Sequence, residues 1–66
     1  MQITLNGEPR SFQGVADVAG LVSALGLDIR KVAVERNLEI VPRSAYGKTP
    51  LAEGDRIEIV AFVGGG

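Results

Sequence analysis

The chain opens with alternating apolar and polar side chains, the period of a β-strand with one buried face. Residues 2–6 follow this pattern, with Ile3 and Leu5 on the same face. An Asn-Gly dipeptide comes next, and this pair favours the positive φ angles of a two-residue hairpin turn. We therefore predict a second, antiparallel strand over residues 9–13 that buries Phe12.

The apolar spacing then changes to steps of three and four, which places the apolar side chains on one stripe of a helix. Asp17 can cap the first turn by accepting from backbone amides, and Gly26 can take the left-handed conformation that ends helices. A helix of about nine residues is unstable alone in water, so we expect it to pack on the sheet. Its stripe consists of Val18, Leu21, Val22 and Leu25.

The rest of the chain contains further strand signals separated by a mixed segment. Residues 31–36 and 56–63 are rich in Val, Ile and Ala, and residues 38–41 are a candidate short strand that Pro42 ends. Residues 43–50 are predicted to be an irregular connection. One main helix packed on one face of a mixed four- to five-stranded sheet is the simplest two-layer solution, so we predict an α+β fold.

One helix can cover only one face of such a sheet. We assign Ile57 and Ile59 to the helix side, which places Val60 and Phe62 on the open face just before the end of the chain. An exposed aromatic side chain there is a candidate for docking a partner. The alternative is that these are ordinary surface residues, partly covered by residues 38–50.

Composition and charge exclude many kinds of function. The 66 residues suit one small domain, and the chain contains neither cysteine nor histidine, which excludes disulfides and thiolate nucleophiles and argues against a zinc site or a hydrolase. Seven basic and eight acidic residues are scattered without runs, which argues against nucleic-acid binding. No segment approaches the roughly 20 apolar residues of a membrane span. We expect a soluble, cytoplasmic protein, unprocessed at its N-terminus, with no metal and no stably bound cofactor.

Three glycines, Gly64, Gly65 and Gly66, end the chain. They suit a frayed end, because glycine has permissive backbone angles. They equally suit chemistry on the terminal carboxyl group, since no Cβ hinders attack on the carbonyl and such an end can enter a narrow active site. No helix follows them, so they are not a phosphate-binding loop. With no other reactive group present, the terminal carboxyl group is the chemical handle that remains.

An ordered set of segments resembles the bacterial ThiS family of sulfur carrier proteins. The resemblance spans nearly the whole chain, including the opening hairpin, and no single motif carries it. Two places depart from the family pattern: Leu38 stands where a small or polar turn residue is expected, and residues 45–49 match no fixed pattern. The matching segments are Val32-Ala33-Val34-Glu35-Arg36-Asn37, Ile40-Val41-Pro42-Arg43, Leu51, Gly54-Asp55-Arg56-Ile57-Glu58-Ile59-Val60 and Phe62-Val63-Gly64-Gly65-Gly66.

The resemblance implies a ubiquitin-like β-grasp domain over residues 1–63, a flexible tail over residues 64–66, and a carrier that is not an enzyme. In that family a ThiF-like adenylating enzyme uses ATP and magnesium to convert the terminal carboxylate to an acyl adenylate. Sulfur derived from cysteine replaces AMP, and a ThiG-like thiazole synthase takes that sulfur for the thiazole ring of thiamin. By position, Gly66 would bear the thiocarboxylate, Gly64 and Gly65 would extend the arm, and Val60, Phe62 and Val63 would bind partners.

Other functions stay open at this point. A β-grasp carrier for another pathway, such as a MoaD-like carrier for molybdopterin synthesis, shares the tail, but such proteins are longer. A protein-interaction module with an incidental glycine end is a second alternative. A small enzyme is the third, and the lack of cysteine and histidine argues against it.

Overall fold

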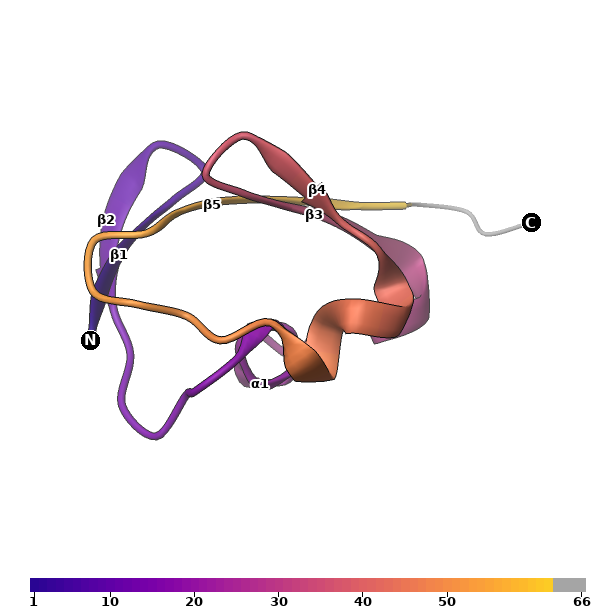
Figure 1. Ribbon diagram of the computed structural model, residues 1–66, viewed down its shortest axis with the longest axis horizontal. Helices are drawn as coiled ribbons and strands as arrows, with labels where there is room; N and C mark the ends of the chain where they lie inside the picture. Colours follow the sequence, from indigo (N-terminus) through magenta and orange to yellow (C-terminus); the bar gives the residue numbers. More distant parts are fainter. Residues whose placement is uncertain (63–66) are drawn as a thin grey trace.

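The computed structural model describes residues 1–62. Within this range five strands form one sheet in the order β2-β1-β5-β3-β4, and one α-helix packs across one face (Figure 1). Strands β1 and β5 run parallel and the other neighbours antiparallel, which confirms the predicted mixed sheet. The elements are β1 (Gln2–Leu5), β2 (Glu8–Ser11), α1 (Val18–Ala24), the 3₁₀ helix η1 (Ile29–Lys31), β3 (Val32–Arg36), β4 (Glu39–Val41), the 3₁₀ helix η2 (Arg43–Lys48) and β5 (Arg56–Ala61).

The first hairpin has the predicted two-residue Asn-Gly turn, and both turn residues have positive φ. Because the turn is this short, Leu5 pairs directly with Glu8, and β2 begins one residue before the predicted start. The strand also ends earlier than predicted. Phe12 lies just beyond it and is half-buried rather than buried, with its amide bonded to the Met1 carbonyl at 2.8 Å and its ring 5.4 Å from the Arg10 guanidinium carbon.

Helix α1 has both predicted caps. The Asp17 carboxylate accepts from the Gly20 amide at 2.7 Å, which satisfies one of the free amides of the first turn. At the other end Gly26 has φ of 73°, and the Leu27 amide reaches the Val22 carbonyl at 3.1 Å. This pattern is a Schellman motif. The buried core joins the helix to one face of the sheet and comprises Ile3, Leu5, Val18, Leu21, Val22, Val32, Val34, Val41, Tyr46, Ile57 and Ile59.

The segment predicted to be irregular instead contains η2, so this prediction was wrong. Tyr46 explains the order of the segment: its side chain is 2% exposed and its hydroxyl donates to the Val32 carbonyl at 3.2 Å. The pairing of β3 with β4 ends at Val34 and Val41, because Pro42 ends β4. The Val32 carbonyl lies beyond this pairing and bonds to the tyrosine hydroxyl instead. A single buried tyrosine leaves no helical period in the sequence. Helix η2 packs beside α1, on the helix side of the sheet (Figure 1).

The β3–β4 hairpin turns on two residues with positive φ, Asn37 at 51° and Leu38 at 71°. This is a two-residue hairpin turn, so β4 begins at Glu39 and not at the predicted residue 38. The turn holds a leucine, 71% exposed, in a left-handed conformation. Such a conformation costs a residue with a Cβ roughly 1–2 kcal/mol. Leu38, which departs from the family pattern, therefore also has a strained backbone conformation.

Hydrogen bonds to the Asp55 side chain connect the β3–β4 hairpin to the segment that precedes β5. Its carboxylate accepts from the Arg36 side chain at 2.8 Å, the Asn37 side chain at 3.1 Å and the Ala52 amide at 2.8 Å, and the residue is 7% exposed. Burial by itself would raise the pKa of Asp55. The hydrogen bonds from Ala52, Asn37 and Arg36 outweigh it, so the net result is a lowered pKa.

Candidate functional site

Strand β5 connects the buried core to the end of the chain. It is the central strand, paired with β1 on one side and β3 on the other. Ile57 and Ile59 are buried on the helix side, while Val60 is 61% and Phe62 54% exposed, which confirms the predicted assignment of faces. The Phe62 amide still donates to the Lys31 carbonyl at 2.7 Å, so the sheet holds the chain up to this residue.

The open face carries an apolar patch at this end of the sheet, which we define as Ala33, Ile40, Val60 and Phe62. Val60 lies directly opposite Ala33 on β3, and Ile40 on β4 is 79% exposed. Helices α1 and η2 both lie on the other face (Figure 1), so neither covers the patch. The alternative that residues 38–50 shield it is therefore not supported within the described residues.

Two carboxylates adjoin the patch. Glu35 on β3 and Glu58 on β5 are direct cross-strand partners on the open face. Like charges directly opposite each other in a sheet are destabilising, and neither carboxylate has an ion-pair partner among residues 1–62. The open face thus combines exposed apolar side chains with uncompensated negative charge.

The remaining predicted site residues lie beyond the described range. Val63, predicted to bind partners, and the tail glycines Gly64, Gly65 and Gly66 fall outside residues 1–62. Their roles stay predictions.

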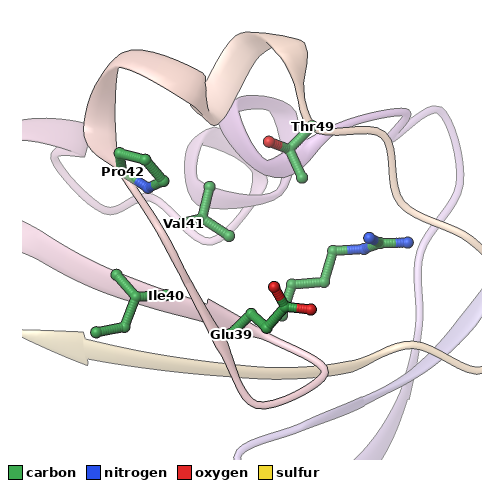
Figure 2. Close-up of a pocket in the computed structure, with 6 residues that line it drawn as sticks. Glu39, Ile40, Val41, Pro42 and Thr49 are labelled. Carbon is green, nitrogen blue, oxygen red and sulfur yellow. The ribbon is translucent and has the colours of Figure 1, made fainter.

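A hollow of about 190 Å³ lies at the β4 edge of the sheet. Figure 2 shows Glu39 on the hairpin below the hollow and Thr49 above it. The guanidinium of Arg36 is already bound to Asp55, and Arg36 pairs with Ile57 near the start of β5, at the opposite end of that strand from its exit. It therefore has no direct relation to the chain end. Its lining consists of Arg36, Glu39, Ile40, Val41, Pro42 and Thr49.

Residues 1–62 hold no group of three or more His, Cys, Asp or Glu side chains arranged to bind a metal ion. None of the helices in this range is both long enough and apolar enough to cross a bilayer. Within residues 1–62, the apolar patch lies beside the exit of β5 toward the chain end.

This chain is similar to known proteins in sequence and in fold. The model of the ThiS family matches residues 3–66. The sulfur carrier protein ThiS of Bacillus subtilis is 37% identical over 65 residues, covering 97% of this chain and 98% of that protein. The crystal structure of a thiamine biosynthesis protein (ThiS) from Geobacter metallireducens has a TM-score of 0.84 and 38% identity, with 100% of both chains covered.

A longer protein is also similar. A thiazole synthase of Paramagnetospirillum magneticum is 54% identical over 66 residues, which is 100% of this chain but 20% of that protein. The chain thus spans about one fifth of the length of this relative. The structural likeness to the Geobacter protein confirms the β-grasp fold. On the family match and the near-complete coverage of its small relatives, this chain belongs to the ThiS family.

Proposed function

We propose that this chain is a sulfur carrier of thiamin biosynthesis and that Gly66 holds the sulfur as a C-terminal thiocarboxylate. One observation carries the proposal: the chain matches, over nearly its full length, small proteins named as ThiS sulfur carriers. The geometry supports it, because β5 runs from the buried core toward a terminal run of three glycines. A carrier needs a firmly anchored strand next to an unhindered carboxyl group.

The proposed chemistry has two steps on the carboxyl carbon of Gly66. A carboxylate is a poor electrophile, so a ThiF-like enzyme first joins it to the α-phosphate of ATP, with magnesium on the phosphates, and releases pyrophosphate. Hydrosulfide supplied from cysteine by the donor system then attacks the carbonyl carbon, so that a C–S bond forms, the C–O bond to AMP breaks, and no oxidation state changes. The net change replaces one carboxylate oxygen by sulfur. The carrier contributes no catalytic group, and Gly64 and Gly65 leave the approach to the carbonyl clear.

Two partners follow from this scheme. The adenylating enzyme must hold the activated end, and a ThiG-like thiazole synthase must receive the sulfur. We assign Val60, Phe62 and Val63 to the contact with these partners, since Val60 and Phe62 belong to the apolar patch beside the exit of β5. The thiazole synthase that contains a region 54% identical to this chain supports the second partner. We propose the cytoplasm as the site of this chemistry, because ATP and the sulfur donor are available there.

Mass spectrometry of the intact chain tests the proposal. After incubation with the cognate adenylating enzyme, ATP, magnesium and the sulfur donor system, the chain should gain about 16 Da, because sulfur replaces oxygen in the acyl substitution. A variant lacking Gly65 and Gly66 is the control and should gain nothing. Its thermal unfolding should match that of the parent, since chain ends of this kind add little to stability. An unchanged mass of the parent chain with an enzyme shown to be active would refute the proposal.

A further inference from the structure

Within residues 1–62, the last part of β5 is paired with a strand on one side only. The pairing with β1 stops at Ile57, because the chain turns away at Asn6 toward β2. The pairing with β3 continues to Ala61. Strand β4 adds no support there, since its own pairing with β3 stops at Val34. The end of β5 therefore forms a two-stranded ribbon with β3, and such ribbons twist more strongly than wider sheets.

The side chain of Asn6 bonds to β5 where the neighbouring strand has ended. The Asn6 backbone amide donates to the Ile57 carbonyl at 2.9 Å. Its side-chain oxygen accepts from the Ile59 amide at 2.8 Å, and its side-chain nitrogen donates to the Ile59 carbonyl at 3.2 Å. The carboxamide thus makes the two hydrogen bonds that a paired residue of β1 would make. It extends the support on this side of β5 from Ile57 to Ile59.

The turn between β1 and β2 places this carboxamide but does not require it. Asn6 has φ of 50° and Gly7 has φ of 84°, the two positive values that such a turn needs. Asparagine tolerates this conformation, and glycine tolerates it at least as well. A glycine in place of Asn6 would keep the turn and lose both bonds to Ile59. The contact with β5 is therefore what distinguishes asparagine at this position.

A second asparagine has the matching place in the other hairpin turn. Asn37 has φ of 51°, and its side-chain oxygen accepts from the Arg56 amide at 2.9 Å. The two asparagine side chains thus bond to the backbone of β5 at different places, Asn37 at its first residue and Asn6 toward its exit. Of the two contacts, that of Asn6 lies nearer in sequence to Gly66.

We propose that Asn6 is a positioning residue for the sulfur-carrying end of the chain. The proposal deepens the proposed function and rests on it. By holding Ile59, the carboxamide limits the twist of the ribbon and fixes the direction in which β5 leaves the sheet toward Gly66. Direction matters for the reaction, because a misplacement of about 1 Å can lower a rate by about a hundredfold. The apolar patch then determines how tightly the carrier binds, and Asn6 determines how well its end is aimed.

Amide hydrogen exchange tests the contact itself. In the parent chain the Ile59 amide should be protected, although β1 has ended beside it. In Asn6→Gly this amide should exchange at least about tenfold faster. The Phe62 amide, which is bonded to the Lys31 carbonyl, is the internal reference and should keep its rate. Equal exchange of the Ile59 amide in the two chains overturns the contact and the proposal with it.

Single-turnover kinetics test the positioning role. The carrier is mixed with excess cognate adenylating enzyme, ATP and magnesium, and the release of pyrophosphate is followed with time. Asn6→Gly should lower the maximal rate constant at least about tenfold. The enzyme concentration that gives half of the maximal rate should change less than about twofold, because the apolar patch is intact. An unaltered rate constant overturns the positioning role, and so does a change confined to that concentration, which would assign Asn6 to binding.

Asn37→Gly is the matched control, because it removes the same side chain from the same turn position and also frees an amide of β5. It should lower the urea midpoint at least as much as Asn6→Gly, since Asn37 also donates to Asp55 at 3.1 Å. Its maximal rate constant should nevertheless equal that of the parent. Equal slowing in both variants would show that lost stability limits the rate, and would overturn the proposal.

A second substitution keeps the test valid where Asn6→Gly does not fold. Asn6→Asp retains the turn, because Asp-Gly is also a favoured pair there. Its carboxylate can still accept from the Ile59 amide, but the Ile59 carbonyl loses its donor. The maximal rate constant should again fall, and a rate constant equal to that of the parent overturns the proposal.

The mass assay of the proposed function separates the two hypotheses. A parent chain that gains sulfur, together with an Asn6→Gly variant that reacts at the parent's rate constant, contradicts the positioning role alone. A parent chain that gains no mass with an enzyme shown to be active contradicts the proposed function, and the positioning role falls with it.

Discussion

Replacing Asp55 by asparagine should destabilise the fold through one identifiable conflict. The two oxygens of Asp55 accept three hydrogen bonds, and an asparagine offers only one oxygen. With that oxygen toward Arg36 and Ala52, the new NH₂ group faces the NH₂ group of Asn37. Asn37 cannot rotate its amide to adapt, because its own oxygen accepts from the Arg56 amide at 2.9 Å. One hydrogen bond is therefore lost and two donors are left facing each other.

The expected cost at neutral pH follows from these contacts. A buried donor without an acceptor costs about 1–3 kcal/mol, and the remaining bond from Arg36 loses its charge-assisted strength. We expect Asp55→Asn to lose about 2 kcal/mol of the free energy of unfolding. A domain of this size has a total on the order of 3–10 kcal/mol, so the loss is a large part of it. With a urea dependence of about 1 kcal/mol per M, the unfolding midpoint should fall by about 2 M.

The stabilisation that Asp55 gives to the fold should also depend on pH. The pKa of Asp55 is lowered in the folded state, whereas an unfolded aspartate titrates near about 3.9. The folded state therefore holds the proton less readily, and the stabilisation from Asp55 is complete above the unfolded pKa. It disappears as the pH falls through the folded pKa. The difference between parent and Asp55→Asn should be constant near pH 7 and shrink below about pH 4.

Urea unfolding followed by far-UV circular dichroism, from pH 7 to pH 3, measures both effects. Asp28→Asn is a suitable control, because Asp28 is also ion-paired but belongs to an exposed pair and such pairs contribute little. Its midpoint at pH 7 should equal that of the parent. A loss below about 0.5 kcal/mol for Asp55→Asn at pH 7, or a difference that stays the same at pH 3, would show that the Asp55 contacts do not hold the hairpin as described.

Three further substitutions test other features. Leu38→Gly should stabilise the fold by about 1 kcal/mol, because glycine avoids the left-handed strain; a lower urea midpoint would mean that the leucine side chain contributes packing. Tyr46→Phe removes the buried bond to the Val32 carbonyl and should cost about 1 kcal/mol, or about 4–8 °C in melting temperature by calorimetry; an unchanged melting temperature would contradict the role given to Tyr46. Phe62→Ala should weaken binding to the adenylating enzyme by more than about 1 kcal/mol without lowering the melting temperature, and equal affinities by titration calorimetry would make Phe62 an ordinary surface residue.

Local features were predictable because neighbouring residues encode them. The Asn-Gly turn, the Asp17 cap and the Gly26 helix end depend on the conformational preferences of adjacent residues, and all three occur in the structure. The alternation along the last strand likewise assigned Val60 and Phe62 to the open face. Composition narrowed the chemistry, since a chain without cysteine or histidine lacks the usual nucleophile and base. The end of β2 and the helix at Tyr46 were missed, because a local pattern does not show where a pairing partner stops.

By itself, the sequence determined the order of the strands and the main helix, the caps and the two faces of the last strand. It also pointed to the terminal glycines as the chemical handle, which stays a prediction. Only the tertiary structure decided which distant groups meet: Asn6 with Ile59, Asp55 with Arg36, and Glu35 with Glu58. It also decided that the pairing of β5 with β1 stops at Ile57, while its pairing with β3 continues to Ala61. The physical reason is that pairing between residues some 20 to 50 positions apart depends on loop closure and on shared burial of the whole sheet. Those energies are absent from any short window of sequence.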